Sequence, residues 1–181
     1  MSEQELVQKC CAGDVIAQGE LYTQYAGRLL ALCRRYCSDP DDAHDLMQDA
    51  MIKAVEKMHS FTYRGNGSLY SWISRIAVNM AVSSIRKHRF LHISLDSTAL
   101  KDIPDPPPEE VVDIPKEMML EMISNMPPVR RAVFNMYCID GYSHKEISEK
   151  LGITEKGSAS TLAKARNSLK EQIADYLKKN E

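Results

Sequence analysis

The sequence predicts an all-α protein of two small helical domains joined by a flexible, acidic, proline-rich linker, with a helix-turn-helix in the second domain. Three observations predict this fold class. Apolar residues recur at spacings of three and four along most of the chain, as they do in amphipathic helices. Prolines and acidic residues crowd into residues 94–115. A glycine turn between helix-capping residues interrupts the helical pattern near Gly152.

The first domain is expected to span residues 1–93. A short amphipathic turn covers residues 6–11 and breaks near Gly13. A second helix runs from about Leu21 to Cys37, because apolar side chains return there every three or four positions.

A stop-and-restart signal follows at Ser38-Asp39-Pro40. Proline disfavours helix at the residue before it but suits a first helical turn. We therefore expect a third helix from here toward His59. A glycine-containing loop covers residues 62–68, and a further helix covers residues 69–89.

The linker, residues 94–115, holds too many prolines for a packed helix or a central strand. The second domain, residues 116–181, begins with a helix over about 129–137. The Ser-x-x-Glu pattern of Ser143 and Glu146 then predicts a capping box at the start of a short helix that ends at Leu151.

The turn Gly152-Ile153-Thr154 separates this short helix from a long basic one. Glycine ends the first helix and Thr154 caps the second, which is typical of a helix-turn-helix. The second helix would enter the major groove of DNA by its N-terminal residues. The alternative is a helical hairpin with a solvated basic face.

Composition excludes several classes of protein. The 181 residues are 44% hydrophobic, which suffices for buried cores. No apolar run approaches the roughly 18–20 residues that a membrane span needs. The start Met-Ser-Glu-Gln-Glu also lacks the features of a signal peptide, so we expect a cytoplasmic protein. No nucleophile–base set or phosphate-binding loop supports the alternative of a small helical enzyme.

The five cysteines are odd in number and irregularly spaced, which argues against a disulfide framework. Cys33 and Cys37 share a helix face, with His44 not far beyond, so a zinc site is the alternative. The surrounding apolar pattern favours buried, unreactive thiols. We expect no metal and no cofactor.

Charge is segregated along the chain. The net charge is +1 over residues 1–95, −5 over residues 96–115 and +2 over residues 116–181. Residues 60–95 contain basic side chains and no acid, whereas residues 39–49 contain five aspartates. Such segregation indicates that different parts of the chain face partners of different charge.

Motifs in both halves resemble the extracytoplasmic-function group of bacterial RNA polymerase sigma factors, over nearly the whole chain. These motifs are Asp-Pro-Asp-Asp-Ala-His-Asp-Leu-Met-Gln-Asp-Ala (39–50), Tyr-Arg-Gly-Asn-Gly-Ser-Leu-Tyr-Ser-Trp-Ile-Ser-Arg-Ile-Ala-Val-Asn (63–79), Met-Pro-Pro-Val-Arg-Arg-Ala-Val-Phe (126–134), Gly-Tyr-Ser-His-Lys-Glu-Ile-Ser (141–148) and Ala-Lys-Ala-Arg (163–166). The resemblance implies a sigma factor that directs core RNA polymerase to promoters and promotes DNA opening.

The resemblance implies that the aspartate-rich helix docks on a coiled coil of the polymerase clamp. The matching positions are Asp42, Asp45, Leu46, Gln48, Asp49 and Ile52. An acidic face suits a basic protein partner and repels DNA. The alternative, that the aspartates only satisfy a helix N-terminus, explains Asp41 and Asp42 but not Asp45 and Asp49.

The resemblance assigns −10 promoter DNA to the loop and helix that follow, with the loop as a pocket for a flipped base. The candidate residues are Arg64, Asn66, Ser68, Trp72, Arg75, Asn79, Arg86 and Lys87. Cations hold a separated strand and an aromatic or amide group catches an unstacked base. Trp72 has a second interpretation, because tryptophan at helical spacing is often a core residue.

The resemblance assigns −35 promoter DNA to the last helix. The candidate residues are Lys156, Gly157, Ala159, Ser160, Thr161, Ala163, Lys164 and Arg166. The family's usual Gly-Thr-Val-Lys-Ser-Arg-Leu carries cations where this chain has Ala159 and Thr161, so we expect fewer phosphate contacts.

The same resemblance implies an anti-sigma factor as a further partner and no small-molecule substrate. It places the linker in polymerase channels that normally hold nucleic acid, where its acidic residues either mimic a polyanion or form a solvated tether. The alternative function is a conventional helix-turn-helix regulator that binds duplex DNA without polymerase.

Overall fold

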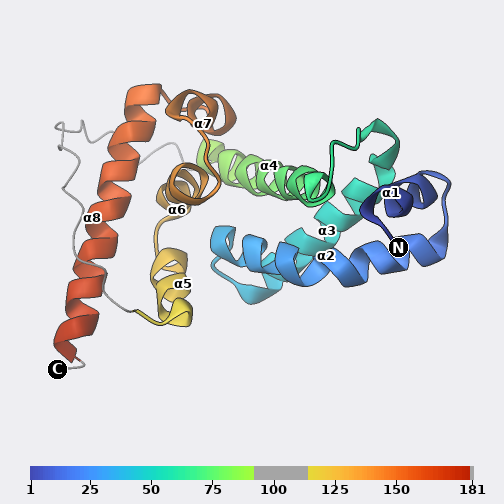
Figure 1. Ribbon diagram of the computed structural model, residues 1–181. Coiled ribbons are helices and arrows are strands. Elements are labelled where there is room, and N and C mark those ends of the chain that lie inside the picture. The colour runs from blue at the N-terminus through green and yellow to red at the C-terminus, as the bar shows by residue number, and fades with distance from the viewer. Residues whose placement is uncertain (92–113, 180–181) are drawn as a thin grey trace. The chain divides into compact units, whose positions relative to one another are not determined.

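The computed structural model describes residues 1–91 and 114–179, and every regular element in this part of the chain is a helix (Figure 1). The predicted all-α fold class is confirmed. Contacts divide the chain into two compact units, Met1–Ala81 and Val82–Glu181. The predicted linker, residues 94–115, lies almost entirely outside the described residues.

The first unit is built from α1 (Glu3–Cys11), α2 (Val15–Tyr36), α3 (Pro40–Glu56), the short 3₁₀ turn η1 (Met58–Ser60) and the first part of α4 (Ser68–Leu91). Helix α2 packs along α3, and α1 packs against α2 (Figure 1). The largest fully buried side chains here are Leu6, Leu21, Leu29, Tyr36, Met47, Met58, Leu69 and Ile73.

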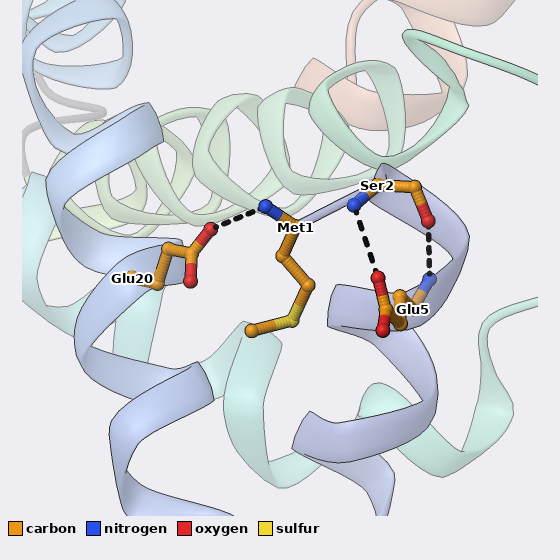
Figure 2. A network of polar contacts seen from close by, with 4 residues as sticks. All are labelled: Met1, Ser2, Glu5 and Glu20. Atoms are coloured by element: carbon orange, nitrogen blue, oxygen red, sulfur yellow. Dashed lines mark hydrogen bonds and ion pairs between the residues drawn. The ribbon is translucent and has the colours of Figure 1, made fainter.

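The start of α1 is fixed by a reciprocal capping box (Figure 2). The Glu5 amide donates to the Ser2 hydroxyl at 3.2 Å, and the Ser2 amide donates to the Glu5 carboxylate at 3.4 Å. The amino group of Met1 lies 3.4 Å from the carboxylate of Glu20 on α2. These contacts hold the first turn of α1, which carries Glu3, beside α2.

Helix α2 begins at Val15, earlier than the predicted start at Leu21. The Asp14 carboxylate caps it by accepting from the amides of Ile16 and Ala17 at 2.9 and 3.1 Å. Val15 and Ile16 are 77% and 79% exposed. The apolar periodicity does not reveal this first turn because its apolar side chains face solvent rather than the core.

The predicted restart before α3 is confirmed. Asp39 caps the helix by accepting from the Asp41 amide at 2.7 Å, and Pro40 occupies the first helical position. Proline suits this position because the first amides of a helix have no intrahelical acceptor.

The second unit contains α5 (Lys116–Ser124), α6 (Pro128–Phe134), the π-helical turn η2 (Asn135–Ile139), α7 (His144–Leu151) and α8 (Glu155–Lys179). Helices α5, α6 and α7 each contact α8. Helix α5 was not predicted from the sequence. The sequence predicts one helix over 129–137, whereas the chain changes to a π turn at Asn135, whose carbonyl accepts from the Asp140 amide at 2.9 Å.

A buried cation joins α5 to α6. Arg131 is only 3% exposed, and its Nη1 donates to the Ser124 carbonyl at the end of α5 over 2.6 Å. A guanidinium at this position satisfies a terminal carbonyl and complements the negative end of the helix dipole.

The cysteines do not all lie where the sequence analysis expects them. Cys10 and Cys33 are buried, and burial raises the pKa of the Cys33 thiol to about 12. Cys37, which was expected to be buried with Cys33, is only half-buried, and Cys11 and Cys138 are exposed. None of the described helices has the length and apolar character of a membrane span.

Candidate polymerase and nucleic-acid interfaces

Helix α3 separates a buried face from an acidic one. Ala43, Met47 and Ala50 are buried, whereas Asp42, Asp45 and Asp49 are exposed. At 100° per residue, the three aspartates and Ile52 fall on the side opposite the buried alanines. The predicted polymerase-binding residues are therefore gathered on one outward face.

Ile52 adds an apolar side chain, 57% exposed, at the C-terminal end of this acidic face. Leu46 is half-buried at its edge. Gln48 lies to one side and contacts the exposed His44, with Nε2 of Gln48 3.0 Å from Nδ1 of His44. Within the part of the chain that the structure describes, no basic side chain pairs with Asp45 or Asp49. An unpaired acidic face with an exposed aliphatic residue has the chemistry of a protein-binding surface.

The loop before α4 is shaped by one carboxylate from α1. The Oε2 of Glu3 accepts from the Gly67 amide at 2.8 Å, and its Oε1 accepts from the Leu69 amide at 3.0 Å. The hydroxyls of Ser68 and Tyr25 also donate to it, at 3.4 and 3.2 Å. Glu3 therefore caps α4 from another helix.

These contacts change the acidity of both partners. Burial raises the pKa of the Glu3 carboxyl, but the hydrogen bonds from Leu69, Gly67, Tyr25 and Ser68 outweigh burial and leave that pKa below its ordinary value. Burial, followed by the charge of Glu3, raises the pKa of Tyr25 to about 12. At neutral pH the carboxylate is therefore ionised and the phenol is a donor.

The predicted loop residues are held by short-range hydrogen bonds. The Ser68 hydroxyl accepts from the Arg64 amide at 3.2 Å, and the Asn66 side-chain carbonyl accepts from the Tyr63 hydroxyl at 3.0 Å. The side chains of Arg64 and Asn66 are exposed. The loop thus presents a cation and an amide above a fixed backbone.

The predicted residues of α4 are exposed along the helix, except for Ser68 at its start and Trp72, which are half-buried. The Trp72 side chain packs on Phe61, with ring centroids 5.1 Å apart. Arg75 and Asn79 follow on the same side, one and two turns further on, and both are exposed. The exposed residues Arg86 and Lys87 lie near the end of the helix. A mixed aromatic and cationic face of this kind can hold a single strand.

The predicted helix-turn-helix is present. Ser143 and Glu146 form both hydrogen bonds of the capping box at the start of α7. Gly152 ends α7 at φ 66°, a left-handed conformation that suits glycine. The Thr154 hydroxyl then caps α8 by accepting from the Gly157 amide at 2.9 Å.

Gly157 packs closely on this cap. A Cβ at this position would lie 3.0 Å from the Thr154 hydroxyl oxygen, so a side chain there would require the cap to shift by a few tenths of an ångström. Of the other predicted −35 residues, Lys156 and Ala159 are exposed. Those that are half-buried along α8 are Ser160, Thr161, Ala163, Lys164 and Arg166.

A polar and aromatic cluster supports the first turn of α8. The His144 ring stacks on Tyr137 of the π turn, with centroids 4.4 Å apart and planes inclined by 19°. His144 Nδ1 lies 2.9 Å from the hydroxyl of Ser158, which is fully buried. The Arg166 guanidinium lies 6.0 Å from the Tyr137 ring centre. His144 and Ser158 were not predicted from the sequence, because neither residue departs from an ordinary helical pattern.

Comparison with known families shows the family to which the chain belongs. The model of sigma-70 region 2 matches residues 21–90, and the model of sigma-70 region 4 matches residues 116–169. The chain belongs to the sigma-70 family, and it is therefore an RNA polymerase sigma factor that acts in transcription initiation at promoter DNA. Within that family it is a member of the extracytoplasmic-function (ECF) group.

Curated relatives match almost end to end. The ECF RNA polymerase sigma-E factor of Haemophilus influenzae is 26% identical, over 96% of this chain and 96% of that protein. The RNA polymerase sigma-H factor of Pseudomonas aeruginosa is 26% identical, over 97% and 96%. The ECF RNA polymerase sigma-E factor of Escherichia coli K12 is 25% identical, over 99% and 98%.

Solved structures share the fold. The sigma factor RpoE of Bartonella quintana, crystallised with the anti-sigma factor NepR, gives a TM-score of 0.53 at 23% identity over 86% of this chain and 96% of that one. CnrH in complex with the cytosolic domain of CnrY gives 0.50 at 18% identity, over 96% and 97%.

Proposed function

We propose that this sigma factor divides its work among three surfaces: the acidic face of α3 binds core polymerase, the loop and exposed face of α4 bind the −10 element as a single strand, and α8 binds the −35 duplex. The chain contributes binding free energy and no catalysis of its own. Because core polymerase is a cytoplasmic enzyme, the chain would act in the cytoplasm.

The polymerase surface is supported by the carboxylates of Asp45 and Asp49, which have no basic partner among the described residues and lie on the same side of α3 as the exposed Ile52. Such charges, placed against cations of a partner, steer association and select against DNA, which is itself an anion. This one observation carries the proposal, because acidic side chains without a basic partner and an exposed aliphatic side chain gather on one helix face.

The −10 surface is supported by the contrast between α3 and α4. The exposed side of α4 presents Arg75, Asn79, Arg86 and Lys87, and residues 60–95 contain no acid. Cations hold the strand, while the loop amide of Asn66 and the ring of Trp72 are available to an unstacked base. Binding of the separated strand lowers the free energy of promoter opening.

The −35 surface is supported by the helix-turn-helix, whose α8 begins with the exposed residues Lys156 and Ala159. An exposed alanine methyl can contact a thymine methyl, and Ser160 can bond to several bases. We also propose an anti-sigma partner that covers the DNA surfaces of the free chain. One solved structure with this fold, the sigma factor RpoE of Bartonella quintana, is in complex with an anti-sigma factor.

Charge reversal on α3 tests whether its acidic face binds core polymerase. The double variant Asp45→Lys/Asp49→Lys is expected to weaken binding of the purified chain to core polymerase by on the order of 100-fold and to abolish run-off transcription. Its matched control is Glu171→Lys/Asp175→Lys, which places the same charges at the same spacing on exposed positions of α8 and is expected to retain polymerase binding.

The outcomes separate the alternatives. Unchanged polymerase binding in the α3 variant contradicts the proposed docking face. Duplex DNA binding without any measurable affinity for core polymerase would instead indicate a conventional helix-turn-helix regulator.

A further inference from the structure

The carboxylate of Glu3 connects two parts of the first unit that are far apart in sequence. Each of its oxygens is used twice: Oε2 by the Gly67 amide and the Tyr25 hydroxyl, and Oε1 by the Leu69 amide and the Ser68 hydroxyl. Three of these four donors belong to the end of the loop and the start of α4. Glu3 also lies before residue 21, where the match to the region 2 model begins.

Glu3 is linked through Ser68 to the loop that forms the proposed base pocket. Ser68 is shared, because its hydroxyl donates to Glu3 and accepts from the Arg64 amide. The backbone on both sides of Asn66 is therefore tied to one carboxylate. Loss of that carboxylate would free the Gly67 and Leu69 amides and leave the Ser68 hydroxyl without its acceptor.

General stabilisation alone is a poor account of this arrangement. The ordinary device for the first amides of a helix is a local Ser, Thr, Asp or Asn cap, as Asp14 and Asp39 provide for α2 and α3. At α4 the position before the helix is Gly67, which has no side chain, and the cap comes from another helix. A remote cap fixes the path of the loop as well as the start of the helix.

We infer that Glu3 is a positioning residue for base selection at the −10 element: it holds residues 63–68 in the shape that discriminates the captured base, without touching DNA itself. This inference rests on the proposed −10 function of the loop. Glu3 is half-buried beneath its donors, so its carboxylate is directed at the amides and hydroxyls of the chain rather than presented to the strand.

The test measures base selectivity in the reconstituted holoenzyme. Single-stranded −10 oligonucleotides carrying each of the four bases at one position at a time are bound by wild-type and Glu3→Gln holoenzymes. Glutamine keeps the size of the side chain but turns one acceptor oxygen into a donor. The ratio of affinities for the preferred and the other bases at the captured position is expected to fall about five- to tenfold. This fall corresponds to the free energy of about one hydrogen bond. The ratios at the other positions should be unchanged.

Glu5→Gln is the matched control, because it makes the same chemical change two residues away on α1. Glu5 belongs to the Ser2 capping box and has no hydrogen bond to the loop. Glutamine can also serve at this position of a capping box, so the turn that carries Glu3 is kept and the base preferences should equal those of wild type. If Glu3→Gln weakens all four bases equally, with the ratio of affinities preserved, Glu3 acts on stability alone and the inference is overturned. If wild-type holoenzyme shows no base preference at any position, the proposed −10 function fails first.

A second measurement uses the full chain without polymerase, in case the variant does not assemble. Trp72 is the only tryptophan, and it packs on Phe61 at the beginning of the loop. Acrylamide should quench its fluorescence more strongly in Glu3→Gln than in Glu5→Gln. Equal quenching in both variants would show that the loop keeps its shape without the carboxylate and would overturn the inference.

Discussion

Nδ1 of His144 lies 2.9 Å from the hydroxyl oxygen of Ser158, and this contact joins the first turn of α7 to the first turn of α8. A face of the same imidazole ring stacks on the ring of Tyr137. Because Ser158 is fully buried, its hydroxyl has no access to replacement water. This polar pair therefore helps to hold the two helices of the helix-turn-helix together.

Substitution of either partner should destabilise the second unit. In Ser158→Ala or His144→Ala, one polar group loses its partner, which is expected to cost about 1–3 kcal/mol. Urea unfolding of the full chain measures this. The double variant should lose less than the sum of the two single losses. Strict additivity would contradict a direct coupling between the two side chains.

Removal of the buried guanidinium should have a larger effect. Arg131→Leu leaves the Ser124 carbonyl without its donor, and the loss in unfolding free energy is expected to be about 2–4 kcal/mol. Arg130→Leu is the matched control, because Arg130 is the adjacent residue and is only half-buried. Its effect should stay below about 1 kcal/mol. Equal losses in the two variants would argue against a special role for Arg131.

Contacts between neighbouring residues can be predicted from the sequence, whereas contacts between distant residues cannot. Ser143, Glu146 and Gly152 are predictable because their partners lie within a few residues and local chemistry dictates the structure. Glu3 and Gly67 are 64 positions apart, and no periodicity connects them. The acidic face of α3 follows from helical spacing alone, so Asp45 and Asp49 are assigned to one surface before the fold is known.

Other misses have equally physical causes. A five-residue π turn at 135–139 cannot be told from an α-helix by apolar spacing, because the pattern covers barely one turn. Arginine is usually a surface residue, so the burial of Arg131 was not predicted. Its burial depends on the Ser124 carbonyl at the end of α5, a helix that was not predicted from the sequence.

Thiol chemistry should sort the cysteines by burial. Cys11 and Cys138 are exposed and should be alkylated by iodoacetamide in the folded chain at pH 8. Cys33 should remain unmodified until the chain is unfolded, because burial raises its pKa to about 12 and keeps it a neutral thiol. Peptide mass spectrometry before and after denaturation measures both. Rapid labelling of Cys33 would contradict its place in the core.

The contribution of Glu3 to stability should depend on pH in one direction. Its pKa is lowered in the folded chain relative to the ordinary value of 4.5, because its hydrogen bonds outweigh the effect of burial. Folding therefore favours the ionised form. The stability that Glu3 contributes is fully present above pH 4.5 and is lost as the pH falls through the lowered folded value.

The measurement is the difference in unfolding free energy between wild type and Glu3→Gln. This difference should be constant between pH 6 and 8 and should shrink on acidification below about pH 4.5. A difference that grows on acidification would mean that the folded chain prefers the protonated carboxyl.

The proposed binding of α8 to −35 DNA can be tested by adding a positive charge to this helix. Ala159 is exposed near the start of α8, at a position where the family pattern carries a cation. Ala159→Lys is therefore expected to add one phosphate contact on −35 duplex DNA. Each added contact releases condensed counterions, so the slope of log affinity against log salt should steepen by about 0.9.

The control for this variant is Ala174→Lys, which adds the same charge to another exposed position of α8, about 22 Å further along the helix axis. Its salt slope should equal that of wild type, because a lysine there is too far from the first turns to reach the same phosphates. Fluorescence anisotropy with labelled duplex over a range of salt concentrations gives both slopes. Steepening in both variants alike would mean that net charge, and not the orientation of α8 in the groove, controls binding; steepening in Ala159→Lys alone fixes the N-terminal end of α8 as the part of the helix that approaches the DNA backbone.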